Sequence, residues 1–218
     1  MIKRIIFDLD NTLIMWKDEY EKSVDKALDK INYHKTEDLY LKINEASFAY
    51  ETENLSYDKR TLIDYINKQL NLELPYEFAD VWLKNLWNCV PKEYPKEDYK
   101  TIEYLSKKYE LVLLTNWFTE CQRKRLESIG ICDFFTEFYG AEKYAKPYKE
   151  SFECAAGRFQ MDEVAMVGDN FKIDIKGALD AGIENVVWID TKNKAAEYKE
   201  GLEGIHMIKG LKQLRNIF

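Results

Sequence analysis

Two aspartates follow the first apolar run of the chain, in the segment Asp8-Leu9-Asp10-Asn11-Thr12. In open α/β sheets, ligands bind beyond the carboxyl ends of the strands, and both carboxylates would lie there. Charged side chains beside a buried strand are costly unless they have a use. An aspartate is ordinarily ionised at neutral pH, so Asp8 would need no base in order to act as a nucleophile.

Further polar residues recur in order along the chain: Thr115-Asn116, Lys146-Pro147, Gly168-Asp169-Asn170 and Asp174. The first and third of these segments directly follow apolar runs, as Asp8 does. Pro147 disfavours helical geometry at Lys146, which therefore arrives from a loop. A D-x-D-x-T motif alone is weak evidence, whereas three strand ends and one basic loop residue in this order indicate a site.

The positions of these groups depend on the elements between them. Apolar runs predict parallel strands at 4–8, 111–115, 163–167 and 185–189, with weaker strands at 137–140 and 205–208. Helical patterns lie at 98–108, 119–129, 149–159 and 172–181, and Gly182 follows the last of them as a C′ glycine would. Strands that alternate with helices predict an α/β fold with a doubly wound parallel sheet.

Residues 16–91 break this alternation. They carry apolar residues at helical spacing and no convincing strand, and Pro75, Pro91 and Pro95 mark their end. A single crossover rarely needs about 75 residues, so we predict an insert of three or four helices. The core would then comprise residues 1–15 and 92–218, and the helical cap residues 16–91.

Composition and charge exclude several classes of function. The 218 residues carry a formal net charge of −7 and no stripe of Lys and Arg, which disfavours binding to nucleic acid or to an anionic membrane. No apolar run is long enough to span a membrane, and Asp8 and Asp10 interrupt the N-terminal run before it could act as a signal peptide. We expect a cytoplasmic monomer or homodimer.

The cysteines and histidines narrow the chemistry further. The four cysteines form no CxxC pair, so we expect reduced, buried thiols rather than a zinc site. Neither of the two histidines lies in a motif, which disfavours Ser-His-Asp and Cys-His enzymes.

The ordered polar segments resemble the haloacid dehalogenase (HAD) superfamily, specifically its phosphatases with a helical (C1) cap after the first motif. The residues that match the four motifs are Asp8, Asp10 and Thr12, then Thr115, then Lys146, then Asp169 with Asp174. The match spans the core, and the insert falls where such a cap would. The resemblance implies a Rossmann-like core with an inserted α-helical cap domain, and hydrolysis of phosphate monoesters.

The same resemblance implies a division of labour among the aspartates. Asp8 would form an aspartyl-phosphate, and Asp10 would protonate the leaving oxygen and then take a proton from the hydrolytic water. Mg²⁺, held by Asp8, the backbone carbonyl of Asp10 and Asp169, would offset the repulsion between carboxylate and phosphate.

The remaining matched residues would bind the phosphoryl group or support the site. Thr115, Asn116 and Lys146 would contact phosphoryl oxygens. Asp174 would orient Lys146 or a metal-bound water, and Thr12 would have a supporting place in the first motif.

The substrate is left open by the sequence. Dehalogenases lack an acid equivalent to Asp10, so its presence points to a phosphate ester of a small metabolite. The insert is rich in aromatic residues, and Trp16 and Trp117 lie within a few residues of matched positions, which makes a nucleoside monophosphate one candidate. A sugar phosphate and phosphoglycolate are others.

Three alternatives to a phosphatase stay open. A phosphomutase of this fold would need an acid/base from the cap, and no residue of the insert stands out for it. A 2-haloacid dehalogenase is opposed by Asp10, and a catalytically dead phosphate-binding protein is opposed by the complete set of chemical groups.

We further expect the insert to close over the site through hinges near Met15–Trp16 and Pro91. We also expect the core to fold without the insert.

Overall fold

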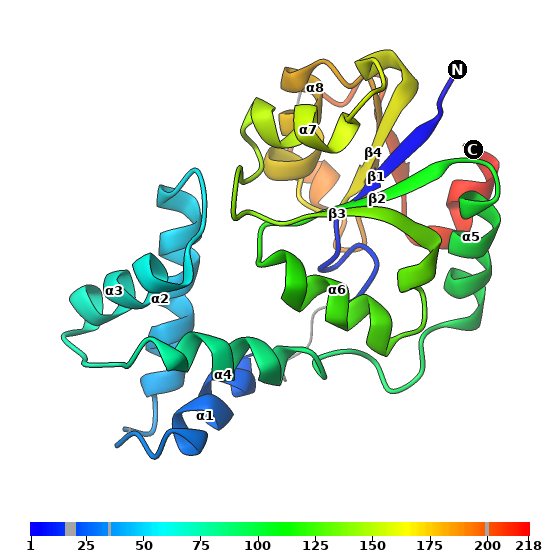
Figure 1. The fold of residues 1–218 in the computed structure, drawn as a ribbon. Helices are drawn as coiled ribbons and strands as arrows, with labels where there is room; N and C mark the ends of the chain where they lie inside the picture. Colours follow the sequence, from blue (N-terminus) through cyan, green and yellow to red (C-terminus); the bar gives the residue numbers. More distant parts are fainter. Residues whose placement is uncertain (16–20, 35, 199–200) are drawn as a thin grey trace.

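The computed structural model of the protein describes residues 1–15, 21–34, 36–198 and 201–218. Within these residues, parallel strands form one sheet in the order β3-β2-β1-β4-β5-β6 (Figure 1). Their bounds are β1 (Arg4–Phe7), β2 (Glu110–Leu114), β3 (Phe135–Tyr139), β4 (Val164–Gly168), β5 (Asn185–Ile189) and β6 (His206–Ile208). The chain begins near the centre of the sheet, builds outward to β3 and then crosses to β4, which confirms the doubly wound fold.

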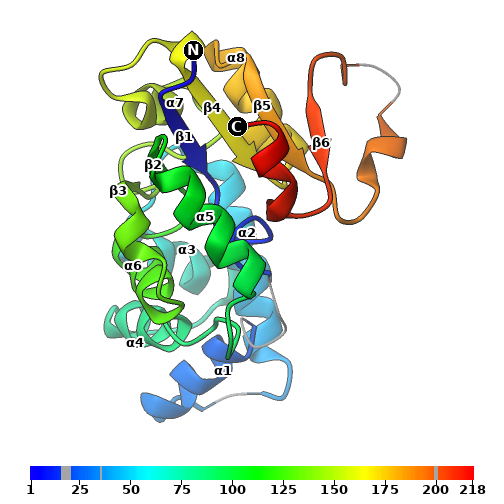
Figure 2. The same cartoon turned by 90° about the vertical axis from the view of Figure 1, so that its right-hand side faces the viewer.

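Helices cover both faces of the sheet, and this explains why its strands are apolar without alternation. Ile5 and Phe7 of β1 pack in a cluster with α5 (Lys96–Ser106) and α6 (Thr119–Ser128). Ile6 packs on the other face with α7 (Lys149–Ala156) and α8 (Gly177–Ala181). Figure 2 shows α5 and the C-terminal turn of 211–216 together over the first face.

The predicted helix at 172–181 is divided in the structure. A π-helical segment spans Phe171–Lys176 and leads directly into α8. The Asn170 side chain caps its start by accepting hydrogen bonds from the backbone N–H groups of Lys172 and Ile173 (3.1 and 3.2 Å). Gly182 ends α8 with φ +99°, as predicted for a C′ glycine.

Four helices make up the described part of the insert: α1 (Glu21–Lys30), α2 (Leu39–Glu53), α3 (Lys59–Leu70) and α4 (Glu77–Leu86). Figure 1 shows them grouped to one side of the sheet. Buried apolar side chains from all four helices form one hydrophobic cluster. The prediction of three or four helices is confirmed, whereas the first proposed hinge, at Met15–Trp16, reaches into residues outside the described part.

The hydrophobic cluster of the insert continues into the core. Its core members are Trp117, Phe118, Cys121, Ala141 and Ala145. The Trp82 and Trp117 rings lie 5.4 Å apart, and the Cys121 thiol donates a hydrogen bond to the Leu83 carbonyl (3.6 Å). The expectation that the core folds without its insert overlooked this packing, because removal of the insert would expose these apolar side chains to water.

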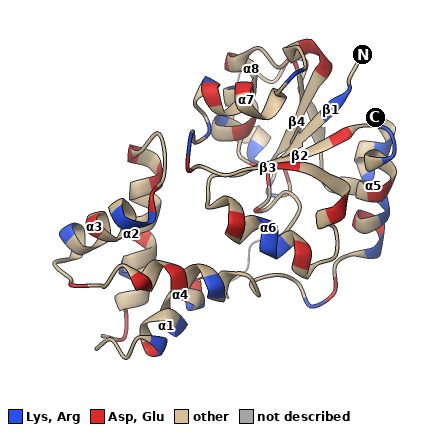
Figure 3. Ribbon diagram, in the orientation of Figure 1, with Lys and Arg blue, Asp and Glu red and all other residues tan. Residues whose placement is uncertain are grey.

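The cysteines, the helices and the charged residues complete the description of the fold. All four cysteines are free, and Cys121 is buried while the other three are half-buried. In the described ranges, no helix combines the length and the apolar character needed to cross a membrane. Figure 3 shows basic and acidic residues interspersed along α5 and α6 and in the insert.

Candidate active site

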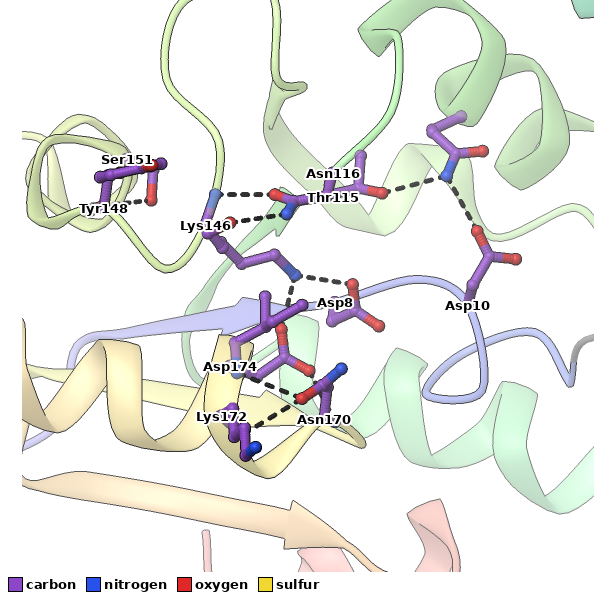
Figure 4. A network of polar contacts seen from close by, with 12 residues as sticks. Asp8, Asp10, Thr115, Asn116, Lys146, Tyr148, Ser151, Asn170, Lys172 and Asp174 are labelled. Atoms are coloured by element: carbon purple, nitrogen blue, oxygen red, sulfur yellow. Dashed lines mark hydrogen bonds and ion pairs between the residues drawn. The ribbon is translucent and has the colours of Figure 1, made fainter. Parts of the chain in front are cut away.

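The predicted site residues converge at one edge of the sheet. β1 lies between β2 and β4, so the residues that follow these strands are neighbours. Asp8 follows β1, Thr115 and Asn116 follow β2, and Asp169 follows β4. Figure 4 shows Asp8, Lys146 and Asp174 pointing toward one another, with Asp10 farther away.

Lys146 joins two of the carboxylates. Its Nζ lies 2.7 Å from Asp8 Oδ1 and 2.7 Å from Asp174 Oδ1, and the residue is only 3% exposed. The Asn116 side chain holds the lysine backbone from both sides: its Oδ1 accepts from the Lys146 N–H and its Nδ2 donates to the Lys146 carbonyl, both at 2.7 Å. The Asn116 side chain therefore positions Lys146, so the predicted contact of Asn116 with phosphate would have to come from its backbone N–H group.

The backbone at the end of β4 holds the Asp174 side chain against Lys146. Asp174 Oδ2 accepts a hydrogen bond from the backbone N–H of Asn170 (2.9 Å), while Oδ1 faces Lys146. A Cβ at position 168 would lie 2.4 Å from the Asp174 side chain. Glycine at the end of β4 is therefore required for this arrangement.

Three carboxylates lie close together here. Oxygen atoms of Asp8, Asp169 and Asp174 lie within 4.8 Å of one another. Burial away from water raises the pKa of Asp8 to about 7, with Asp174 and Asp169 adding to the effect and Lys146 opposing it. Burial and the neighbouring Asp174 raise the pKa of Asp169 to about 6. The expectation that Asp8 is ionised at neutral pH did not consider this burial, and a positive charge nearby would favour its anionic form.

The same surroundings favour the charged form of Lys146. Its burial disfavours the charge, but the carboxylates of Asp174 and Asp8 outweigh that cost and raise the pKa of Lys146 above its ordinary value. The two carboxylates therefore favour the charged form of Lys146.

Asp10 is held apart from this cluster by residues that the sequence interpretation missed. Its carboxylate lies 2.8 Å from Nη1 of Arg125 and accepts a hydrogen bond from Gln122 Nε2 (3.0 Å). Gln122 Nε2 also donates to the Thr115 hydroxyl (3.0 Å), and Arg125 Nη2 donates to the Cys89 carbonyl (3.1 Å). Gln122 and Arg125 share the buried face of α6, three residues apart, and this spacing was the available signal.

A double-mutant cycle should show that Arg125 and Asp10 stabilise each other. Arg125→Met is expected to lower the free energy of unfolding by about 2–4 kcal/mol, since it leaves a partly buried carboxylate without its cation. Combined with Asp10→Ala, the two losses should fall short of additivity by about 1–2 kcal/mol. Urea denaturation of the four proteins gives the coupling, and Arg123→Met, an exposed arginine of α6, is the matched control. Strictly additive losses would contradict the pairing.

A cavity of about 330 Å³ opens beside these residues. Asp8, Asp10, Thr115 and Asn116 contribute from the strand ends, and Phe48 and Glu51 contribute from α2 of the insert. Burial, reinforced by the negative charge of Asp10, raises the pKa of Glu51 well above its usual range. No residue of the insert stood out as an acid or base in the sequence, and Glu51 is the acidic side chain that the insert contributes to this cavity.

The remaining predicted residues have different surroundings. Trp117 borders the cavity but is 3% exposed and packs on Trp82 and Phe118, so it is mainly a core residue. Thr12 is buried and lines a separate cavity with Leu13 and Tyr94. Trp16 lies outside the described residues.

Comparisons with known proteins agree with this geometry. A model of the haloacid dehalogenase-like hydrolases matches residues 2–182. N-acylneuraminate-9-phosphatase from Rattus norvegicus is 26% identical over 211 residues, which cover 87% of this chain and 83% of the relative.

Two solved structures share the fold. YfnB from Bacillus subtilis, a HAD-hydrolase bound to magnesium, aligns with a TM-score of 0.74 and 20% identity, over 99% of this chain and 98% of that one. A 2-haloacid dehalogenase from Pseudomonas syringae pv. Tomato DC3000 aligns with a TM-score of 0.68 and 23% identity, over 100% and 98% of the two chains. At these identities the likeness shows the fold alone.

Proposed function

The chain belongs to the haloacid dehalogenase-like hydrolase family, and from this premise we propose that it is a Mg²⁺-dependent phosphatase of small phosphorylated metabolites that works through an aspartyl-phosphate. As a member of this family with a phosphatase relative, the chain is a phosphoric monoester hydrolase. One observation carries the mechanism: Asp8 and Asp10 border one cavity but have different partners. Asp8 pairs with Lys146, whereas Asp10 pairs with Arg125 and Gln122.

Asp8 is the proposed nucleophile. Lys146 binds its Oδ1, which leaves the other carboxylate oxygen for attack on phosphorus. The bond from phosphorus to the alcohol oxygen breaks as the aspartyl-phosphate forms. Asp10 is the proposed acid that protonates the departing oxygen, and it then takes a proton from the water that hydrolyses the intermediate. Arg125 and Gln122 would hold Asp10 in place for both steps.

The phosphoryl group has donors on three sides in this proposal. Lys146 supplies an ammonium group beside Asp8. The Thr115 hydroxyl already accepts a hydrogen bond from Gln122, so its own proton is available for a phosphoryl oxygen. The backbone N–H of Asn116 is a third candidate donor, since the side chain is engaged with Lys146.

The donor set of the site suits Mg²⁺. Asp8 and Asp169 with the backbone carbonyl of Asp10 would hold it, and Asp174 would support them from the same carboxylate cluster. All of these ligands are oxygens, which a hard cation prefers. The cation would offset the repulsion between Asp8 and the phosphate and would keep both buried aspartates ionised. The magnesium bound by YfnB supports this assignment.

Removal of the metal tests the proposal. Hydrolysis of p-nitrophenyl phosphate is expected to be lost in EDTA and to return with Mg²⁺, while Ca²⁺ serves as the comparison ion. Because the pKa values of Asp8 and Asp169 are raised to about 7 and about 6, protons compete with the cation below pH 7. The Mg²⁺ concentration for half-maximal activity should therefore be higher at pH 6 than at pH 8. Full activity after exhaustive chelation would refute the mechanism.

The insert is the proposed substrate cap, with residues 16–91 as its extent. α2 supports this role because it carries Phe48 and Glu51 to the cavity that contains Asp8 and Asp10. A phosphate-release screen over nucleoside monophosphates, sugar phosphates and phosphoglycolate, with Mg²⁺ present, would identify the substrate class.

The position of Glu51 is an observation in favour of one alternative function, a phosphomutase. A phosphomutase of this fold would need an acid/base from the insert, and Glu51 is an acidic side chain of the insert that lines the cavity with Asp8 and Asp10. Transfer of label between sugar positions without release of phosphate would favour that reading. Chloride release from a 2-haloacid would favour a dehalogenase, and failure to hydrolyse any ester with Mg²⁺ would favour a binding protein.

A further inference from the structure

Helix α2 places one acidic side chain in the cavity that the mechanism does not use. Glu51 lines the cavity together with Asp8, Asp10 and Trp117. Its backbone carbonyl accepts a hydrogen bond from the Tyr57 hydroxyl (3.0 Å), which holds this end of α2. Across the described parts of the chain, the Glu51 carboxyl group itself has no hydrogen bond or ion pair with another residue. It is thus a polar group that no other described residue satisfies, in a cavity beside the aspartates that we propose to react.

The surroundings of Glu51 disfavour a further negative charge. The residue is half-buried and faces the negative field of Asp10. Of the described residues that line the cavity, none is Lys or Arg. A second anion in this space would meet the same desolvation and repulsion as Glu51. A hydroxyl or ammonium group would instead find an acceptor that lacks a partner.

Aromatic rings complete this part of the cavity. Phe48 lies three residues before Glu51 on α2, so both side chains project from neighbouring positions on the helix. Phe48 is 48% exposed, and its ring and that of Trp117 border the cavity. The insert thus offers apolar surface and one hydrogen-bond acceptor to the part of a substrate beyond its phosphate.

We propose that Glu51 is the specificity-determining residue of the insert, and that it selects phosphate esters whose alcohol carries a hydrogen-bond donor, above all an amine, and no second anionic group. The inference rests on the proposed phosphatase function, because the phosphate must occupy the strand-end side of the cavity. Glu51 then accepts a hydrogen bond from the alcohol portion, while Phe48 contacts its carbon atoms.

Three two-carbon esters of similar length test this proposal. Phosphoethanolamine, 2-hydroxyethyl phosphate and phosphoglycolate present an ammonium, a hydroxyl and a carboxylate at the same distance from phosphorus. In the wild-type protein with Mg²⁺, kcat/KM should be highest for the amine and lowest for the carboxylate. A bound ammonium group would favour the anionic form of Glu51. Glu51→Gln keeps the shape but cannot take up this negative charge, so kcat/KM for phosphoethanolamine should fall by about tenfold to a hundredfold relative to phosphoglycolate, as expected when a charge-assisted hydrogen bond is lost.

Two further variants make the result specific. Glu51→Lys should invert the ranking and make phosphoglycolate the best of the three esters. Glu45→Gln removes the same charge from an exposed position of α2 and should leave the ranking unchanged. Equal ratios in wild-type protein, Glu51→Gln and Glu51→Lys would overturn the proposal.

The failure of the phosphatase proposal would be visible separately. If the wild-type protein does not hydrolyse p-nitrophenyl phosphate with Mg²⁺, that function is wrong whatever Glu51 does. Calorimetric binding of the same three esters to the wild-type and Glu51→Gln proteins then decides the role of Glu51. Preference for the amine that is lost in Glu51→Gln supports it, and identical affinities in both proteins refute it.

Discussion

Asp8→Asn is expected to abolish turnover of every phosphate ester and to leave no trapped phosphoenzyme. An amide is a far weaker nucleophile than a carboxylate and a poorer ligand for Mg²⁺. Asparagine is nearly isosteric with aspartate. Burial already disfavours the charged form of Asp8 and raises its pKa to about 7, so the fold should tolerate a neutral side chain at this position. Phosphate release and mass spectrometry of acid-quenched protein would measure both effects, with circular dichroism as the check on folding.

The chain offers a matched control for this substitution. Asp190 is also a buried aspartate directly after a parallel strand, but it caps the backbone N–H groups of Lys194 and Ala195 instead of joining the carboxylate cluster. Asp190→Asn should therefore keep most of the activity. Phosphate found covalently bound to the Asp8→Asn protein would show that another residue is the nucleophile.

Asp10→Asn is expected to slow the hydrolysis of alkyl phosphates by about 10²–10⁴-fold, the usual value of a general acid/base. The asparagine oxygen can still accept hydrogen bonds from Arg125 and Gln122, so the position of the side chain should persist. The loss should be smaller for p-nitrophenyl phosphate, whose leaving group needs no proton. The ratio of kcat/KM for the two ester types, compared between the wild-type and variant proteins, measures this difference.

Hydrolysis of the aspartyl-phosphate, the second chemical step, tests the role of Asp10 independently. Because hydrolysis of the intermediate still needs a base, the Asp10→Asn protein should accumulate phosphoaspartate with the activated ester. Quenched-flow mass spectrometry would locate the phosphate on Asp8. Phosphate on Asp10 of the wild-type protein would reverse the two roles, and equal losses for both ester types would refute the acid role of Asp10.

Most of the fold could be predicted because its central strands are buried on both faces. Such strands read as continuous apolar runs, and the four strong runs correspond to β1, β2, β4 and β5. The two weaker predictions, β3 and β6, are the edge strands, where polar residues such as Thr136 and His206 are tolerated. Asp8 and Asp169 come together because parallel neighbours end at the same edge of the sheet.

Gln122, Arg125 and Glu51 could not be singled out from the sequence, for a physical reason. Helical periodicity tells which residues share a face, but not what that face will meet. Gln122 and Arg125 became visible only when α6 was packed beside the Asp10 loop. Glu51 became visible only when α2 was placed against the strand ends. The raised pKa of Asp8 depends in the same way on burial by the whole assembly rather than on its neighbours in the chain.

The apolar contact between insert and core has a consequence for protein engineering. Exchange of inserts between relatives is an obvious route to new substrate ranges, but the insert of this chain shares a hydrophobic cluster with the core. Trp82 and Leu83 of the insert meet Trp117, Phe118 and Cys121 of the core. A chimaera that crosses over only at residues 15 and 91 would join two surfaces that never packed together. The core segments 117–121 and 141–145 pack against the insert and should be taken from the same donor as the insert.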